Sequence, residues 1–209
     1  MACGSGQATA DLARRFGRVH ATEASAAALA HAPTLEGVSY RCETAEHCHL
    51  TDASVDLIVV AQALHWFDLP AFFAECGRVL RRNGVLAAWC YQDFDAPEAI
   101  ATVTAEFRKR IEPYWPPERR YIDEGYAHFD WPWEALAAPQ FPMTANWNLA
   151  QLLGYLSSFS AVVRCGKATG SDPVRAFSGR FREQWGDPDR CRRIRWPLRL
   201  HLRQRGGAD

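Results

Sequence analysis

Apolar and polar positions along residues 1–90 switch between two periods, one typical of helices and one typical of strands. Four stretches have the length and pattern of strands: 18–23, 38–42, 56–61 and 85–89. Three stretches place apolar residues at helical spacing: 7–16, 26–32 and 69–80. The run Asp56–Ala61 is apolar and β-branched after its first residue, which predicts a central strand buried on both faces. Asn83-Gly84 predicts a turn before the last of these strands.

Strands that alternate with helices through short connections are typical of an α/β fold. The pattern predicts a doubly wound, Rossmann-like and mostly parallel sheet. Ligands of such sheets bind beyond the carboxyl ends of the strands. Functional residues are therefore expected directly after each predicted strand.

The pattern changes after residue 96. Helices are predicted over 97–111, 149–162 and 172–185, and a strand over 141–147. Residues 193–203 alternate around Pro197, which predicts an antiparallel C-terminal edge strand. Nine aromatic side chains in residues 113–147 predict a lid over a ligand pocket. We place no domain boundary, so 1–209 is expected to form one domain with three parts: a ligand-binding half at 1–96, a helical and aromatic insertion at 97–147, and C-terminal helices with the edge strand at 148–209.

The composition excludes several classes of protein. Lys plus Arg and Asp plus Glu number 24 each, so the net charge is zero and no nucleic-acid partner is indicated. The longest apolar stretch, 54–67, is too short and too polar to cross a bilayer, and residues 1–6 have no signal-peptide pattern. Seven cysteines without CxxC spacing indicate reduced thiols and therefore a cytoplasmic protein. The oligomeric state stays open.

Gly4 and Gly6 precede the first predicted helix, and glycines let a backbone approach a ligand closely. Glu23 ends the next strand, 17 residues after Gly6, where a carboxylate can accept both hydroxyls of a ribose. Each signal has an ordinary alternative. Such glycines also occur in dinucleotide-binding turns, and Glu23 alone fits a plain surface residue.

Three further segments adjoin predicted strands. Ala45 and Glu46 come after the strand at 38–42, and residues 62–68 (QALHWFD) follow the strand at 56–61 directly. Residues 78–86 (RVLRRNGVL) lead from a helix through a turn into a strand.

Together these segments resemble the class I S-adenosylmethionine-dependent methyltransferase family. CGSGQAT is similar to its glycine-rich motif, ATEAS to its acidic strand end, and RVLRRNGVLAAW to its signature before strand five, with Arg82 and Asn83 in place of Pro and Gly. The resemblance covers residues 2–91. The later segments WNLAQLLGYLSSFSA and RWPL are similar to a subgroup that includes trans-aconitate methyltransferases.

The resemblance implies S-adenosylmethionine as the cofactor, and each site residue then has an expected place. The resemblance assigns Cys3, Gly4 and Gly6 to the methionine part, Glu23 to the ribose, Ala24, Ala45 and Glu46 to the adenine, and Gln62 and Ala63 to the pocket below the sulfonium.

Methyl transfer is an in-line displacement at carbon, so the enzyme mainly aligns donor and acceptor in a dry site. The acceptor is expected to be a small molecule with a carboxylate or hydroxyl oxygen. His65 and Trp66 are placed to meet it, and Tyr91 is a further candidate. His65 can act as the general base for a hydroxyl, whereas a carboxylate needs none. The alternative for His65 is a packed, hydrogen-bonded histidine.

Three alternatives stay open. Cys42, His47, Cys48 and His49 match no standard zinc spacing, so no metal is predicted. A nicotinamide-dependent oxidoreductase would need Gly or Ala where Thr9 stands, and it leaves HWFD and RVLRRNG unexplained. The third alternative is a non-catalytic remnant of the cofactor-binding fold.

The remnant is considered because the family's first strand, and the Asp that ends it, would precede Met1. That strand is central in the family's sheet. Without it, both neighbouring strands would leave backbone groups unpaired, at about 1–3 kcal/mol for each buried group. We therefore expect the chain as written to lack its first strand, to fold poorly and to bind the cofactor weakly.

Overall fold

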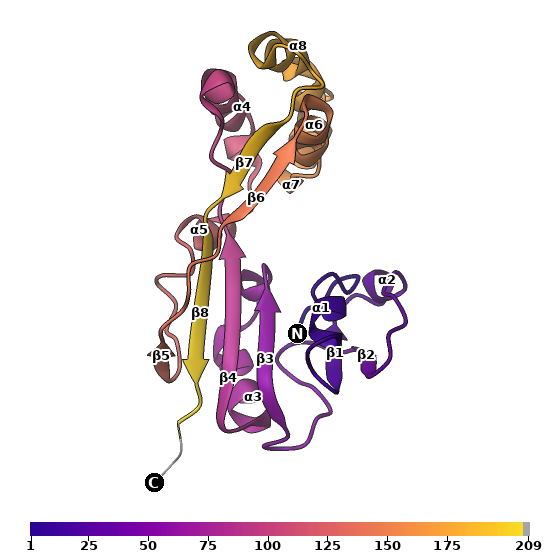
Figure 1. Ribbon diagram of the computed structural model, residues 1–209, viewed down its shortest axis with the longest axis vertical. Coiled ribbons are helices and arrows are strands. Elements are labelled where there is room, and N and C mark those ends of the chain that lie inside the picture. The colour runs from indigo at the N-terminus through magenta and orange to yellow at the C-terminus, as the bar shows by residue number, and fades with distance from the viewer. Residues whose placement is uncertain (207–209) are drawn as a thin grey trace. The chain divides into compact units, whose positions relative to one another are not determined.

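The strands predicted in the first half of the chain form in the computed structural model, which describes residues 1–206 (Figure 1). These residues divide into two units. The first unit contains residues 1–90, 124–140 and the C-terminal segment from Arg199, and the second contains 91–123 and 141–198. The residues expected to form a single domain thus form two compact units.

In the first unit, β1 (Val19–Glu23) and β2 (Val38–Cys42) pair in parallel, with Glu23 opposite Cys42. The helices beside them are shorter than predicted: α1 spans Thr9–Ala13 and α2 spans Ala26–Leu29. Ala8 offers no side-chain cap to α1, whereas Ser25 caps α2 by accepting a hydrogen bond from the Ala28 N–H at 3.2 Å.

A second sheet of this unit has the strand order β3-β4-β8-β5. It contains β3 (Val55–Ala61), β4 (Leu80–Tyr91), β5 (Glu134–Leu136) and β8 (Leu198–Gln204). β3 and β4 are parallel, and β8 runs antiparallel to β4, as Figure 1 shows. The predicted antiparallel direction of the C-terminal strand is confirmed. Its predicted position at the edge of the sheet is wrong, because the three-residue β5 pairs with its outer side.

β3 was predicted to be a central strand buried on both faces, and this is wrong. It is the outer strand of its sheet, and only Ile58 and Val60 are buried, both on one face. Among residues 1–206, no strand pairs with its free edge, and the Met1 amino group donates a hydrogen bond of 2.8 Å to the Val59 carbonyl there. The side chains of Leu57, Val59 and Ala61 are therefore only partly buried.

α3 (Leu69–Val79) covers one face of this sheet (Figure 1). Its predicted inner residues Phe72, Cys76 and Val79 are buried, and Asp68 caps it through the Ala71 N–H. The predicted Asn83-Gly84 turn forms as a bulge inside β4 rather than before the strand. Asn83 has a φ of 63°, and the Asn83 N–H and the Gly84 carbonyl both bond to Arg205, so two residues face one. The register with β3 shifts at this point, since Val55 is opposite Leu80 and Leu57 is opposite Val85.

The second unit is built on helices and one pair of strands. It contains a 3₁₀ turn (Glu98–Ile100), α4 (Ala101–Ile111), a second 3₁₀ turn (Glu112–Tyr114), α5 (Arg119–Asp123), β6 (Met143–Trp147), α6 (Leu149–Ser157), α7 (Ser160–Thr169), α8 (Pro173–Trp185) and β7 (Arg192–Trp196). β6 and β7 are antiparallel. Phe107, Phe181 and Trp185 are fully buried at the centre of its core.

Two predicted elements of this unit are each divided in two. The helix expected over 149–162 breaks at Phe159, whose backbone is extended, after the hydroxyls of Ser157 and Ser158 bond to carbonyls of the preceding turn. The strand expected over 193–203 breaks at Pro197, which has no N–H to donate, into β7 and β8. None of the helices formed by residues 1–206 combines the length and apolar character that crossing a membrane requires.

Candidate active site

The glycine-rich segment lies between β1 and β3 and bonds to both. The Cys3 N–H donates to the Thr22 carbonyl of β1 at 2.9 Å, while Met1 bonds to β3. The Gly6 N–H closes a turn on the Cys3 carbonyl at 2.9 Å. Gly4 and Gly6 have φ values of 57° and 86°, a region that favours glycine. The loop therefore begins beside the carboxyl ends of both strands, where the sequence predicts a ligand.

Glu23 is held by this loop. Its Oε2 accepts a hydrogen bond from the Gly4 N–H at 2.9 Å, and its Oε1 accepts one from the Ser25 N–H at 3.0 Å. The side chain is half-buried at the end of β1. These two bonds fix the position of the carboxylate before any ligand is present.

The residues predicted to bind the adenine follow β1 and β2 and have different surroundings. Ala24 is exposed, and its carbonyl accepts a hydrogen bond from the Cys42 thiol at 3.5 Å. Ala45 is buried. Glu46 Oε1 accepts a hydrogen bond from the Asp68 N–H at 3.1 Å, so this segment is tied to the one that follows β3.

Gln62 and Ala63 form the bend at the end of β3. Gln62 has a φ of 55°, and its N–H donates to the Trp89 carbonyl of β4 at 2.8 Å. Ala63 is buried. The bend turns the chain into a 3₁₀ turn, η1 (Leu64–Trp66), which carries His65 and Trp66.

His65 is buried, with 8% of its surface exposed, whereas Trp66 is exposed. The Nδ1 atom of His65 lies 2.8 Å from the hydroxyl of Tyr126, and the two rings are 6.0 Å apart. Burial raises the pKa of Tyr126 well above its ordinary value, so the hydroxyl is protonated at neutral pH. This pair fixes the orientation of the His65 ring.

Tyr126 is positioned by a strained turn. Gly125 and Tyr126 both have positive φ values, of 62° and 61°. A Cβ atom at Gly125 would lie 2.7 Å from Cγ of Arg199, so only glycine fits there. Phe129 stacks on Tyr126 with ring centroids 5.0 Å apart, and His201 hydrogen-bonds the Gly125 carbonyl at 2.8 Å.

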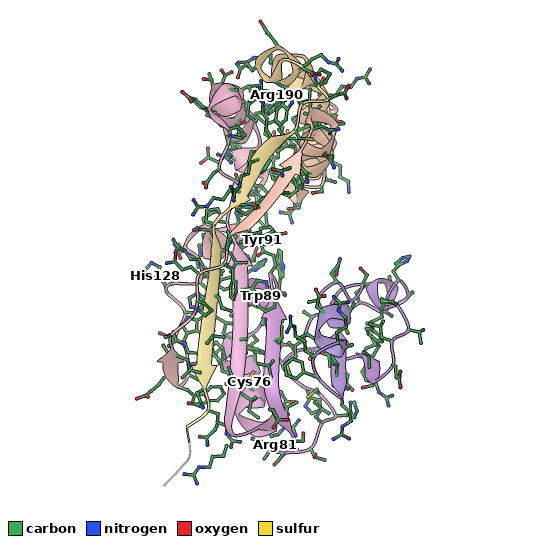
Figure 2. All side chains as sticks on the ribbon, in the orientation of Figure 1. Cys76, Arg81, Trp89, Tyr91, His128 and Arg190 are labelled. Atoms are coloured by element: carbon green, nitrogen blue, oxygen red, sulfur yellow. The ribbon has the colours of Figure 1, made fainter. Side chains whose placement is uncertain are left out.

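Tyr91, the remaining predicted pocket residue, ends β4 two positions after Trp89 (Figure 2). Its half-buried ring packs against the core of the second unit. The expected acceptor role of Tyr91 therefore stays a prediction. The aromatic segment 113–147 is likewise divided between the units: its residues 124–140 belong to the first, and Tyr114, Trp115 and Trp147 pack against the core of the second.

The RVLRRNG segment supports the loop after β2. Glu75 is buried, accepts the Cys48 N–H at 2.8 Å, and pairs with Arg78 Nη2 at 2.7 Å. The Arg78 guanidinium also donates to the carbonyls of Cys48 and Leu50. Hydrogen bonds from Arg78 lower the pKa of Glu75 to about 2. This ion pair holds the loop that carries Ala45 and Glu46.

Tyr126 and Ser25 contribute to the site beyond the predicted residues. Tyr126 lies 61 positions from His65 in the sequence. Ser25 follows the acidic strand end and caps α2 with its side chain, and its N–H also orients Glu23. A positive signal for Tyr126 was the preceding glycine, because a Gly-aromatic pair within a proline-rich segment is typical of a tight turn.

Comparison with known proteins gives consistent matches. Residues 1–88 match the model of the methyltransferase domain family. A Dictyostelium discoideum protein described as a methyltransferase is 36% identical over 173 residues, which are 81% of this chain and 66% of that protein. A methyltransferase-like protein of Schizosaccharomyces pombe is 27% identical over 132 residues, covering 61% of this chain and 49% of its own length. The chain thus spans 66% and 49% of these relatives.

Solved structures agree with these matches. A structure described as a type II methyltransferase from Anaeromyxobacter dehalogenans has a TM-score of 0.90 and 37% identity, and the match covers 99% of this chain and 88% of that one. A methyltransferase from an antibiotic biosynthesis pathway of Anabaena variabilis shares the fold, with a TM-score of 0.56 at 14% identity. The glycine loop with its anchored Glu23, the family match and the identity to these proteins agree, and the chain belongs to the class I S-adenosylmethionine-dependent methyltransferase family.

Proposed function

We propose that this chain transfers a methyl group from S-adenosylmethionine to an oxygen of a small-molecule acceptor, a carboxylate or a hydroxyl. The observation that carries the proposal is the Glu23 carboxylate, which two backbone N–H groups fix beside the glycine loop. A carboxylate at the end of this strand can accept both hydroxyls of a ribose. A cytoplasmic location accords with the seven free cysteines.

The residues around the loop fit this cofactor. Gly6 has a positive φ, and a Cβ atom there would lie 3.1 Å from the Tyr40 hydroxyl and 3.2 Å from Cδ of Pro33, so glycine lets the loop pack closely against these two side chains. A carboxylate offers about four acceptor positions, and Gly4 and Ser25 use two of those on Glu23, which leaves two for the ribose hydroxyls.

When bound, S-adenosylmethionine supplies an electrophilic methyl group on a sulfonium. The residues of the chain would bind and orient the cofactor and would take the proton from a hydroxyl acceptor. Glu23 would hold the ribose, Ala45 and Glu46 the adenine, and Gln62 and Ala63 the wall below the sulfonium. His65 would take the proton of a hydroxyl acceptor through Nε2, which requires that Nδ1 carries the ring's own proton and donates it to the Tyr126 hydroxyl.

The first prediction tests Glu23. Glu23→Ala removes charge-assisted hydrogen bonds worth about 1.5–3 kcal/mol, so the affinity for S-adenosylmethionine should fall about tenfold or more by calorimetry. Glu23→Gln retains the size of the side chain and should show most of that loss. Glu36→Ala, at an exposed carboxylate before β2, is the matched control and should bind normally. Unchanged affinity in a folded Glu23→Gln variant would refute the assignment.

The second prediction concerns Tyr126. Tyr126→Phe removes only the hydroxyl that contacts His65, a hydrogen bond worth about 1 kcal/mol, so kcat should fall about fivefold while the cofactor affinity is retained. In a His65→Ala background the same substitution should have no further effect, because Tyr126 acts through His65. An equal loss in both backgrounds would contradict this account, because the Tyr126 hydroxyl would then act independently of His65.

The activity is assayed by release of S-adenosylhomocysteine from a panel of small carboxylic acids and phenols. Turnover of a carboxylic acid or phenol, lost in Glu23→Ala, is the expected result. Binding of S-adenosylmethionine without turnover of any acceptor in the panel would contradict the proposed acceptor class. Failure of the wild-type protein to bind S-adenosylmethionine would contradict the proposal itself.

A further inference from the structure

Two histidines and a glutamate meet on the β1–β2 pair, outside the residues assigned to the cofactor. His20 lies on β1, Glu43 directly follows β2, and His49 lies in the loop after it. One donor atom from each of the three side chains lies within 4.8 Å of the others. Neither His20 nor Glu43 has a part in the proposed methyl transfer.

The distances are close to those of a metal site. His20 Nε2 lies 3.4 Å from Glu43 Oε2, and His49 Nδ1 lies 2.5 Å from Glu43 Oε1. Ligands at about 2.0–2.1 Å from a tetrahedral zinc ion are about 3.4 Å apart. His20 Nε2 and Glu43 Oε2 already have this separation. His49 Nδ1 and Glu43 Oε1 are closer, and a small rotation of the exposed His49 side chain would separate them. The two imidazole rings are 4.7 Å apart at 72°.

Ser39 completes the arrangement. Its hydroxyl lies 2.9 Å from Nδ1 of His20, on the strand position opposite it. A proton on Nδ1 that bonds to Ser39 leaves the lone pair on Nε2, the nitrogen that faces Glu43. Histidines that bind metals almost always have such a partner on the second nitrogen. The side chains of His20 and Glu43 are 12% and 19% exposed, and that of His49 is 51% exposed, so one side of the cluster opens to solvent.

We propose that His20 Nε2, the Glu43 carboxylate and His49 Nδ1 bind a divalent transition metal, with zinc as the best match. Two imidazoles and one carboxylate form a ligand set that zinc takes with a fourth position left open. This site differs from the group Cys42, His47, Cys48 and His49 that the sequence analysis considered as metal ligands. Cys42 bonds to the Ala24 carbonyl, the Cys48 N–H bonds to Glu75, and only His49 is common to both.

The site also adjoins the cofactor residues through the backbone. The Glu43 N–H donates to the Glu23 carbonyl at 3.1 Å, and residues 43–49 include Ala45 and Glu46. A metal that joins His20 of β1 to Glu43 and His49 would fix both ends of this segment. Its role is therefore to order the loop beside the cofactor site, and the metal takes no part in the methyl transfer.

The test uses the tag-free, reduced full chain. Zn²⁺ affinity is measured by competition with a chromophoric chelator, and the ligand type by the visible spectrum of the Co²⁺-substituted protein. We expect one tight equivalent, and a Co²⁺ spectrum of a four-coordinate site without the thiolate charge-transfer band. His20→Ala, His49→Ala and the conservative Glu43→Gln should each weaken binding at least tenfold. His47→Ala and His31→Ala, two exposed histidines outside the cluster, should bind as the wild type does.

Three results would overturn the proposal. One is the absence of any equivalent that competes with the chelator. Another is a thiolate band in the Co²⁺ spectrum, which would assign the metal to the free cysteines. The third is binding that His47→Ala weakens as much as His49→Ala does. Circular dichroism of each variant ensures that a loss of binding is not a loss of fold, and none of these readouts depends on methyl transfer.

Discussion

Replacing His65 by alanine is expected to lower kcat about 10²–10⁴-fold on a hydroxyl acceptor, the usual contribution of a general base. The affinity for S-adenosylmethionine should stay nearly unchanged, because the assigned cofactor residues lie elsewhere in the site. The structure favours this role because His65 is buried beside the bend that ends β3 and its Nδ1 contacts the Tyr126 hydroxyl. Steady-state kinetics and calorimetry on the same preparation separate the two effects.

The matched control is His31→Ala, which removes an exposed histidine from the same unit and should leave kcat unchanged. A carboxylate acceptor gives a second comparison, since it is already ionised and should lose much less rate in His65→Ala. Full activity of the variant on a hydroxyl acceptor would show that His65 is a packed, structural histidine.

Replacing Glu75 by glutamine is expected to reduce the free energy of unfolding by about 3 kcal/mol at pH 7. The pKa of Glu75 is lowered from 4.5 to about 2 in the folded chain, and each pKa unit corresponds to about 1.4 kcal/mol. Glu75 is 6% exposed, so solvent screens the pair with Arg78 only weakly. Urea unfolding of both proteins measures the difference.

The sign of the pH dependence follows from the same shift. A carboxyl group whose pKa is lower in the folded state stabilises the fold above its unfolded value of 4.5, and this contribution is lost as the pH falls through about 2. The difference between wild type and Glu75→Gln should therefore be constant from pH 7 down to about 5 and shrink below that. Asp56→Asn, which breaks the exposed pair with Arg81, should cost less than about 1 kcal/mol. Equal losses in the two variants would contradict the account.

The lid over the acceptor pocket stays a prediction. Four rings of the aromatic segment belong to the first unit. Trp133 lies against Gly77 of α3, and Tyr126, Phe129 and Trp131 pack around His65 and His201. Their contacts favour a role in holding His65 over a role in covering the acceptor.

The sequence by itself determined the elements whose signals are local. β1 and β2 lie at their predicted positions because short runs of strand-forming residues between turn and helix signals are local features of the sequence. The helix predicted over 172–185 forms as α8, with Asp172 as its cap, since capping needs only a neighbouring side chain and backbone N–H groups. Glu23 was predictable in position because it is the last residue of β1, and the glycine loop because Gly4 and Gly6 mark a turn by their own backbone freedom.

Only the tertiary structure decided which distant segments meet. Tyr126 reaches His65, Glu75 reaches Cys48, and Glu43 joins His20 to His49, and none of these pairs has a fixed spacing in the sequence. Periodicity records that a residue is buried but carries no information about its partner. The strand order that leaves β3 at the edge of its sheet is decided in the same way, because backbone hydrogen bonds between strands are independent of side-chain identity.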